Sequence, residues 1–584
     1  MFRLILFAFL CSITCAADKP NIIVIYTDDH GFADLGIRGV EKDVKTPHLD
    51  ALARSGVIAR NGYSTAPQCV PSRGGLMTGK FQGRFNLDNN GSSLDGFNKE
   101  TTIATRLQKA GYTTAQFGKW HLGPQGEITR HGFQHVWSQH GPQKFPANIT
   151  LEGKGRPMGD VQPSVYHIDG CARAAASVIE RYKAQPFFLY IAFRAPHTPL
   201  DAPQSYKDRF PGAMPERRRA ALGMLAAVDD GVGLITSTLK KHSLAETTLI
   251  FFIGDNGAPL KIHKIDSPLK GDPGGWDGSL NTPLNGEKGM LAEGGMHVPF
   301  LIAWPGTIPG GQTYDHPVSA LDVAATAAAV ADIAVKPGEL DGVDLVPYLQ
   351  GEDSKPPHDA LMWRWMAQSA IREGDWKLLR GGDREYLYNL ATDLEEKHNL
   401  ASQHSDIATR LRTRLRDWCA ELNPPGLALG PMASVWNDYF DFYLEGKAAP
   451  KINAKAEPDL AATRGWQARG GSLIEKEGLL LLTPERGGKG TFITRSQLKL
   501  PGPATVSISF KTAASGQGAI AWRMDGDKDF LAANRVPFGV KASDDWQTSE
   551  VQIPAQGRVI HVRVHLPAGP VQFRTLDLRP ASPR

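Results

Sequence analysis

The sequence predicts an α/β domain built on a large mixed, mostly parallel sheet flanked by helices, followed by a small antiparallel subdomain and an appended β-sandwich. In the first part of the chain, short and nearly continuous apolar runs alternate with helical segments, which is typical of a parallel sheet covered on both faces. From about residue 359 the expected strands become short and closely spaced. From about residue 454 they recur at intervals marked by turn residues, as in sandwiches.

Five apolar runs provide the expected strands of the main sheet: residues 22–26, 113–117, 187–193, 249–253 and 300–304. Between the first two, residues 46–56 predict a helix, because Thr46 suits the N-cap, Pro47 the first turn and Gly56 the end. Ligands of open α/β sheets bind beyond the carboxyl ends of the strands, so the residues that follow these runs are candidates for a site. Those after the first four runs are Asp28 and Asp29, Lys119 and His121, His197, and Asp255 and Asn256.

The later segments predict two smaller units. Strands near residues 369–372, 376–379 and 386–388 and a charged amphipathic helix from Ile407 to Trp418 form the subdomain. The strands expected in the sandwich are residues 478–482, 490–495, 504–511, 519–523, 548–553, 559–566 and 571–578. We therefore divide the chain into a signal peptide (1–17), a catalytic α/β domain (18–345), its C-terminal subdomain (346–425), a linker (426–453) and a sandwich of candidate carbohydrate-binding function (454–584).

The amino terminus has a basic start and a short apolar run followed by small residues, which predicts a secretory signal cleaved after Ala17. The alternative is a lipoprotein signal that retains Cys15, although Ser12, Ile13 and Thr14 match that context poorly. In both cases we expect a secreted or periplasmic protein without a membrane span. The formal net charge of +4 is small and no long Lys or Arg run occurs, so nothing indicates a nucleic-acid partner.

Of the five cysteines, Cys11 and Cys15 belong to the signal, and only Cys69, Cys171 and Cys419 remain. Three widely spaced cysteines form neither a disulfide framework nor a C-x-x-C motif, so at least one is a free thiol or is chemically altered. We expect Cys171 and Cys419 to be buried thiols.

Several ordered motifs resemble the sulfatase family. The segment 69–79, CVPSRGGLMTG, is similar to the signature in which the cysteine of C-x-P-S-R is oxidised to formylglycine. Around it lie Asp28-Asp29, GKWHLG at 118–123, APH at 195–197, DNG at 255–257, EKG at 287–289 and EGG at 293–295. The resemblance covers about residues 20–420 and implies an alkaline phosphatase-like fold, a sulfatase-maturing enzyme as partner during biogenesis, and hydrolysis of sulfate esters.

The residue types also suit that chemistry. A sulfate ester repels nucleophiles and develops negative charge on its bridging oxygen during cleavage, so a site needs fixed positive charge and a proton donor. Arg73, Lys119 and Lys288 are the candidate cations. Carboxylate and amide oxygens favour calcium or magnesium over zinc. A helix that begins after Cys69 would also direct backbone amides toward an anion.

The resemblance assigns a role to each candidate residue. Cys69, as formylglycine, supplies the nucleophilic hydroxyl, and His121 is the base that releases sulfate from it. His197 is the general acid at the leaving oxygen, Arg73 and Lys119 steady the formylglycine, and Lys119 and Lys288 hold the sulfate oxygens. One calcium ion is implied. Its expected ligands are Asp28, Asp29, Cys69, Asp255 and Asn256.

Taken singly, each candidate also has an ordinary structural interpretation. Asp28 and Asp29 could be a solvated turn, Cys69 a small buried residue, and Lys119 a surface charge. Their occurrence together at matching strand ends favours the site. One position departs from the family pattern, since His297 stands where many members have arginine, which puts local loop packing in doubt.

Two other functions remain open at this stage. A phosphonate or phosphate ester hydrolase of the same superfamily would use a similar fold and anion site, and an inactive carbohydrate-binding protein would lack turnover. The added sandwich suggests a sulfated polysaccharide or oligosaccharide substrate by analogy. The sequence identifies neither the sugar nor the sulfated position.

Overall fold

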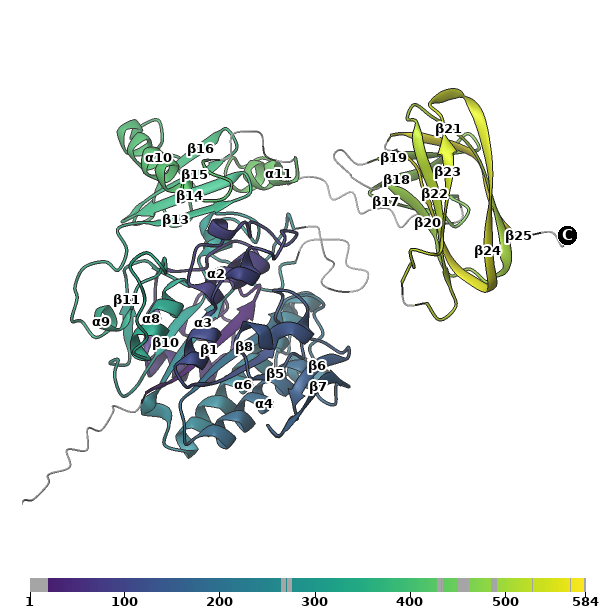
Figure 1. Ribbon diagram of the computed structural model, residues 1–584. Coiled ribbons are helices and arrows are strands. Elements are labelled where there is room, and N and C mark those ends of the chain that lie inside the picture. Colours follow the sequence, from purple (N-terminus) through teal and green to yellow (C-terminus); the bar gives the residue numbers. More distant parts are fainter. Residues whose placement is uncertain are drawn as a thin grey trace, which may run out of the picture. The chain divides into compact units, whose positions relative to one another are not determined.

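The computed structural model describes residues 19–263, 269, 276–427, 432, 434–449, 460, 462–484, 491–527, 529–567 and 569–581 (Figure 1). The chain forms two compact units, Met1–Ile452 and Asn453–Arg584. The expected signal peptide at residues 1–17 lies outside the described residues. Within the described part, one helix, α6 (Glu216–Lys241), is long and apolar enough to cross a membrane, but 78% of its most apolar stretch is buried inside the protein.

A ten-stranded mixed sheet organises the first unit and confirms the expected mixed, mostly parallel architecture. Its order is β11-β2-β10-β9-β1-β8-β4-β5-β6-β7. The central strands β9, β1, β8, β4 and β5 run parallel, whereas β10, β6 and β7 introduce antiparallel pairs. The strands are β1 (Asn21–Asp28), β2 (Val57–Ala59), β4 (Thr113–Gly118), β5 (His135–Trp137), β6 (Phe145–Ile149), β7 (Gly155–Val161), β8 (Phe187–Pro196), β9 (Thr248–Gly254), β10 (Phe300–Ala303) and β11 (Gln312–Tyr314).

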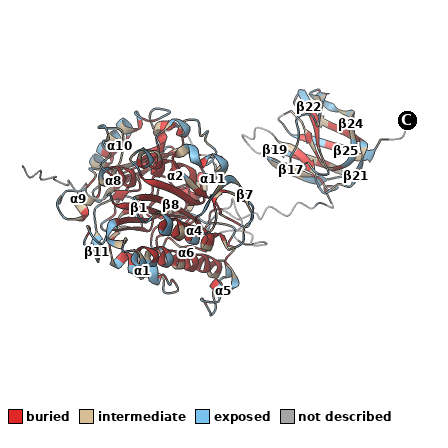
Figure 2. Ribbon diagram, turned by 60° about the horizontal axis from the view of Figure 1, so that its bottom comes forward, coloured by how far each residue is buried: buried red, intermediate tan, exposed pale blue. Residues whose placement is uncertain are grey.

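Helices cover both faces of this sheet, and its central strands are buried (Figure 2). Side chains at alternate positions of β1 point to opposite faces, so Ile23 and Ile25 join one core while Ile22 and Val24 join the other. The first core contains α1 (Pro47–Arg54), α4 (His167–Tyr182) and α6, and the second contains α2 (Cys69–Thr78), α3 (Ile103–Lys109) and α8 (Asp322–Val330). Shorter elements are α5 (Gln204–Lys207), α7 (Glu293–Met296), α9 (Val346–Leu349), β3 (Gly62–Tyr63) and β12 (Val318–Ser319).

The start of α1 differs from the expectation in one detail. Pro47 is the first helical residue, but the Thr46 side chain accepts no capping hydrogen bond from the helix. Instead, Asp229 of α6 accepts hydrogen bonds from the backbone amides of His48 and Leu49, at 3.2 and 2.8 Å. A carboxylate 181 residues away therefore replaces the local cap, which no short-range sequence pattern reveals.

The expected antiparallel subdomain consists of β13 (Leu361–Trp365), β14 (Gln368–Glu373), β15 (Trp376–Gly381) and β16 (Arg384–Asn389), packed with α10 (Ser405–Cys419). The range 426–453, which we expected to be a linker, contains the helix α11 (Ser434–Tyr443). Trp436 and Phe440 of α11 pack in the same core as Trp365 of β13. Much of the expected linker therefore belongs to the subdomain.

A buried charge network joins the subdomain to the main sheet region. The Lys377 ammonium group of β15 lies 2.7 Å from a Glu293 oxygen and 2.9 Å from a Glu396 oxygen, with all three side chains at most 1% exposed. His297 lies in the same network, where its Nδ1 is 3.0 Å from Glu293 and its Nε2 is 2.6 Å from the Arg60 carbonyl oxygen. His297 is therefore a buried residue that contacts Glu293 and the Arg60 backbone.

The second unit is an antiparallel sandwich in which the long strand β24 (Ser543–His565) contributes to both layers. Its first part pairs with β21 (Leu500–Thr512), and its last part pairs with β20 (Phe492–Arg495) and β22 (Gly516–Met524). The other strands are β17 (Gln467–Arg469), β18 (Gly471–Lys476), β19 (Leu479–Pro484), β23 (Arg535–Val540) and β25 (Val571–Pro580).

Exposed tryptophan rings can stack on sugars, but two tryptophans of this unit belong to the sandwich core. Trp466 and Trp522 are 0% and 3% exposed and pack against the central apolar residues. Trp546 is partly exposed, but the cationic groups of Lys511 and Arg574 lie 5.0 and 4.7 Å from its ring centroid. These tryptophans therefore do not form an open stacking platform.

Candidate functional site

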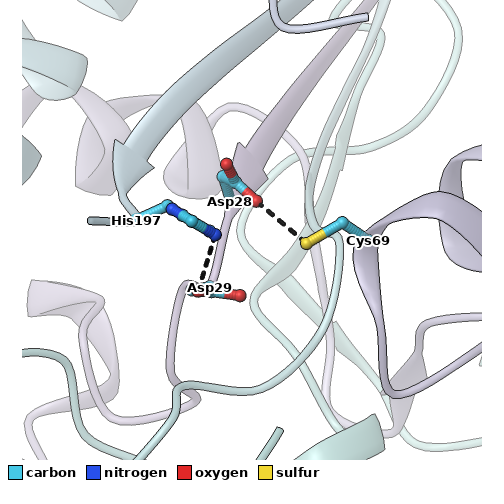
Figure 3. Close-up of side chains that lie close together, drawn as sticks. All are labelled: Asp28, Asp29, Cys69 and His197. Carbon is cyan, nitrogen blue, oxygen red and sulfur yellow. Dashed lines mark hydrogen bonds and ion pairs between the residues drawn. The ribbon is translucent and has the colours of Figure 1, made fainter. Parts of the chain in front are cut away.

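Cys69 is the first residue of α2 and is completely buried. Its Sγ lies 3.4 Å from a carboxylate oxygen of Asp28, the last residue of β1 (Figure 3). The helix is fixed in place by a 2.8 Å hydrogen bond between the hydroxyl groups of Ser72 and Tyr26, and by the Asn90 side chain, which accepts from the Val70 amide. The start of α2 therefore holds the Cys69 side chain against the end of the central strand.

The four acidic and amide residues converge at the ends of β1 and β9. Asp29 adopts a left-handed backbone conformation with φ of 60°, which bends the chain away from β1. Its backbone amide donates to Asp255 at 3.0 Å, and the Asn256 side chain donates to an Asp29 oxygen at 2.7 Å. Asp28, Asp29, Asp255 and Asn256 are all 0% exposed.

Three cations lie among these carboxylates. Arg73 Nη2 is 2.7 Å from an Asp255 oxygen and 3.5 Å from an Asp28 oxygen. Lys119 Nζ lies 2.6 Å from Asp28, and Lys288 Nζ lies 2.8 Å from Asp29. Arg73 is buried, and Lys119 and Lys288 are 7% and 4% exposed, so their charges act in a site with little water and are felt more strongly than at the surface.

The buried carboxyl groups differ in how readily they ionise. Burial would raise the pKa of Asp28, but the charges of Lys119 and other nearby cations hold it well below its usual range. For Asp255, burial and the negative charge of Asp28 raise the pKa to about 7. Burial raises the pKa of the Cys69 thiol, which keeps the unmodified side chain neutral at ordinary pH. A buried thiol in this state is a poor nucleophile.

The two candidate histidines are placed differently. His197 follows β8, and its Nε2 lies 3.7 Å from an Asp29 oxygen while its Nδ1 lies 2.8 Å from the Thr198 carbonyl oxygen (Figure 3). Burial and the charge of Lys119, partly offset by Asp28, lower the pKa of His197 to about 4. His121 is exposed and has a left-handed backbone with φ of 59°, and surrounding protein atoms and the charge of Lys119 lower its pKa.

A cation fits the acidic part of this site. The Oδ1 atom of Asn256 is buried and has no hydrogen-bond partner within the described structure, although its amide nitrogen is fully used. Ligand atoms of Asp28, Asp29, Cys69 and His197 also lie within 4.8 Å of one another. Carboxylate oxygens with an unpartnered amide oxygen beside them match the hard oxygen ligands that Ca²⁺ and Mg²⁺ take.

The structure adds residues to this region that sequence reasoning missed. Arg194, 6% exposed, donates to the carbonyl oxygens of Thr198 and Pro199 at 2.6 and 3.3 Å. The same guanidinium group lies 2.7 Å from Asp201. Arg194 therefore fastens the loop that carries His197. Arg194 precedes the APH motif directly, but no sequence signal shows that its side chain folds back onto the loop.

A second missed group stands beside Lys288. His263 is 3% exposed, and burial and the charge of Lys288 lower its pKa to about 3. Its ring lies next to Trp276, which also contacts the His197 ring, with centroids 6.2 and 5.8 Å apart. Tyr439 of α11 lies 3.3 Å from His263 Nδ1, so the helix in the expected linker reaches the wall of the site.

The geometry brings Cys69, three carboxylates, an amide and three cations to one end of a mostly parallel sheet. The part of the chain that forms this sheet is similar in sequence to a known protein family. The Sulfatase family profile matches residues 20–333. The chain belongs to the sulfatase family. A second profile, N-sulphoglucosamine sulphohydrolase, C-terminal, matches residues 286–421, which include the small antiparallel sheet. Membership makes the chain a sulfuric ester hydrolase with an alkaline phosphatase-like fold, in a family that generally uses a metal ion and formylglycine.

Individual relatives agree with this assignment. The chain is 29% identical over 503 residues to the uncharacterized sulfatase YdeN of Escherichia coli, covering 70% of this chain and 86% of that protein. It is 32% identical to the N-acetylgalactosamine-6-sulfatase of Rattus norvegicus, covering 62% of this chain and 71% of the relative. The crystal structure of Ps i-CgsB in complex with k-i-k-neocarrahexaose matches with a TM-score of 0.61 and 29% identity, covering 75% of this chain and all of that one.

Proposed function

We propose that this sulfatase is exported and removes sulfate from a sulfated polysaccharide or oligosaccharide, with Cys69 converted to formylglycine and calcium as the metal. The observation that carries the proposal is the position of Cys69, buried at the start of α2 and 3.4 Å from Asp28 among three cations. An unmodified thiol in that position has a raised pKa and would be a poor nucleophile. An aldehyde derived from it would supply, once hydrated, a hydroxyl group for attack on sulfur.

The surrounding residues supply charge and direct protons. In the structure Sγ of Cys69 stands for an oxygen of the modified side chain. Arg73 and Lys119 place positive charge beside that side chain, and Lys119 with Lys288 are proposed to bind the sulfate oxygens. Such fixed charges stabilise the anion that develops during cleavage without having to reorganise. His121 is proposed to accept a proton: its lowered pKa leaves the ring neutral in the free site, and the negative charge of a bound sulfate group would make it more basic.

His197 is proposed to protonate the leaving oxygen. In the free site its pKa of about 4 leaves the imidazole neutral at pH 7. A bound sulfate ester adds a negative charge close to the ring, and a nearby anion favours the protonated form. The hydrogen bond between Nδ1 and the Thr198 carbonyl oxygen at 2.8 Å directs Nε2 into the site.

Calcium is proposed because the fitting ligands are all oxygens. Asp28, Asp29, Asp255 and Asn256 would hold the ion, together with the oxygen of modified Cys69. Bound calcium would add positive charge next to the sulfate group. It would also favour ionised Asp255, whose pKa is raised to about 7 by burial and Asp28 in the ion-free protein.

The proposed substrate class is supported by relatives and by the appended sandwich. One relative is named for N-acetylgalactosamine 6-sulfate chemistry, and one structural neighbour was solved with a neocarrahexaose. The expected signal peptide supports export to the outside of the cell, where an enzyme would meet sulfated polysaccharides.

A panel assay tests the proposal. Full-length protein made with and without a sulfatase-maturing enzyme is given 4-nitrophenyl sulfate, the matched aryl phosphonate, and defined sulfated galactans, fucans and glycosaminoglycans. We expect formylglycine at residue 69 by peptide mass spectrometry, sulfate release only from the matured protein, and no activity in Cys69→Ala. Full activity with an unmodified thiol would show that formylglycine is not the nucleophile. Preferred cleavage of the phosphonate would show that a phosphonate ester, and not a sulfate ester, is the substrate class.

A further inference from the structure

One face of the sandwich collects positive charge along its strands. In the last part of β24, Val562 and Val564 pack in the core, so the residues between and beside them point to the opposite face. These outward residues are His561, Arg563 and His565, and all three are partly exposed.

Neighbouring strands add to the same face. Residues directly opposite each other in antiparallel strands lie on one side of the sheet. Arg523 of β22 lies opposite His561. Ala521, also in β22, lies between Arg563 of β24 on one side and Arg535 of β23 on the other, so both arginines share its side of the sheet. On the other side, Phe492 of β20 lies opposite His565, and Arg469 of β17 lies opposite Phe492. We call this surface the arginine face. Its arginines are Arg469, Arg523, Arg535 and Arg563.

Aromatic rings hold the central arginine of this face. The guanidinium carbon of Arg563 lies 3.8 Å from the Phe530 ring centroid and 5.0 Å from the Phe492 ring centroid. Phe530 also contacts the His561 ring, with centroids 4.9 Å apart. Stacking of this kind limits the movement of the guanidinium plane, so less freedom is lost when it binds an anion.

Among the described residues, the four arginines of this face have no ion-pair partner. Arg523 donates instead to the Asp527 carbonyl oxygen at 3.0 Å. Arg558 and Arg579, elsewhere on the same unit, pair with Asp525 and Glu550. Burial, Arg469 and Arg523 together lower the pKa of Arg563, although Asp529 acts against them. Gathering like charges costs folding free energy, which a bound anion would recover.

The size of the face selects an extended ligand. It spans five adjacent strands, in the order β17-β20-β24-β22-β23, and so four intervals between strands. At about 4.8 Å per interval, Arg469 and Arg535 lie on strands roughly 19 Å apart across the sheet. A single sulfate ion cannot contact cations over that width, whereas a chain with repeated anionic groups can.

We propose that the arginine face is a binding site for a sulfated polysaccharide, separate from the active site. Planar guanidinium groups bind tetrahedral oxyanions through paired hydrogen bonds, and the Phe492 and Phe530 rings provide apolar surface beside them for sugar rings. The inference rests on the proposed function, because the polymer bound here would be the one desulfated by the first unit. Both units belong to one chain, so binding here raises the concentration of polymer around the active site.

Binding by full-length Cys69→Ala protein tests the site without turnover. Affinity electrophoresis and titration calorimetry are run with a sulfated galactan, a chondroitin sulfate and a sulfated fucan, each beside its desulfated form, and with single-stranded DNA. The variant Arg469→Gln/Arg535→Gln changes two exposed arginines of the face. The matched control, Arg558→Gln/Arg579→Gln, removes the same charge from two exposed arginines elsewhere on the unit.

We expect at least one sulfated polymer to bind, its desulfated form not to bind, and the face variant to lose about tenfold in affinity while the control stays within about twofold. Equal loss in the two variants, no binding to any sulfated polymer, or equal binding of DNA would overturn the site. Variants that retain Cys69 should hydrolyse 4-nitrophenyl sulfate like the parent. Sulfate release from saccharides by the matured parent is scored separately, so failure of the proposed substrate is distinguished from failure of the arginine face.

Discussion

Replacing Arg194 should impair catalysis through the position of His197. Arg194 donates to the Thr198 carbonyl oxygen at 2.6 Å, and that oxygen lies 2.8 Å from His197 Nδ1. Arg194 also contacts Asp201 at 2.7 Å and His167 Nε2 at 3.1 Å. In Arg194→Met, the side chain keeps a similar length but loses every one of these hydrogen bonds. The loop that carries His197 then loses its charged anchor.

The expected loss follows from the proposed role of His197 as proton donor. A displacement of about 1 Å in a catalytic group costs on the order of 100-fold in rate, and general acid catalysis contributes roughly 10²–10⁴-fold. We therefore expect kcat/KM to fall about 30- to 100-fold on a sulfated alcohol such as a sugar, whose leaving oxygen needs a proton. On 4-nitrophenyl sulfate, whose leaving group is stable as an anion, we expect a loss below about threefold.

The assay compares both ester classes in one set of variants. Arg194→Lys keeps the charge but loses the forked geometry and should fall between the parent and Arg194→Met. Arg209→Met is the control, since Arg209 forms an exposed pair with Asp230 on α6. Thermal unfolding and calcium content are measured alongside. Equal losses on both ester classes, or no loss on the sugar sulfate, would refute positioning by Arg194.

Three further outcomes are expected. Lys377→Met leaves two buried carboxylates without the Lys377 cation and should lower the free energy of unfolding by about 3–5 kcal/mol. Denaturant unfolding measures this loss, with Lys397→Met at an exposed ion pair as the control. A cost below about 1 kcal/mol would show that the network does not stabilise the fold. Asn256→Ala removes a proposed oxygen ligand, so calcium affinity and turnover should fall together by about tenfold or more, and wild-type metal content with wild-type turnover would exclude Asn256 as a ligand. A chain ending after residue 449 retains the whole first unit described and should hydrolyse 4-nitrophenyl sulfate at the parental rate; a folded, matured and inactive product would show that the sandwich completes the site.

Sequence reasoning located β1, β4, β8, β9 and β10 because each contains a short and largely apolar run, but it missed β5 (His135–Trp137), which has only three residues and begins with a histidine. The run at 22–26 and the aspartates after it correspond to β1 and its end, and the run at 249–253 leads to Asp255 in the same way. Burial on both faces makes such strands apolar throughout, and the chemistry follows each strand directly. Fold and candidate site were therefore readable together.

The features that were missed depend on contacts between distant residues. Asp229 caps α1 from another helix, and Arg194 folds back onto a loop, and neither contact has a local signature. The α11 helix lies in a segment rich in Pro, Gly and Ala, and that composition obscured its apolar face. The strands expected at 548–553 and 559–566 fall in one long strand, β24, because the turn residues between them are accommodated by a register shift in the pairing with β21 and do not end the strand.

The central strands that carry the site are neighbours in space but were synthesised far apart. Cys69 precedes Asp255 by 186 residues and Lys288 by 219. During synthesis, the segment around Cys69 therefore leaves the ribosome long before β9 and the Lys288 loop exist to enclose it. In the finished protein the same side chain is 0% exposed. An enzyme that modifies Cys69 must therefore act on the growing or unfolded chain. Once the chain has folded, before or after export, Cys69 is no longer accessible to it.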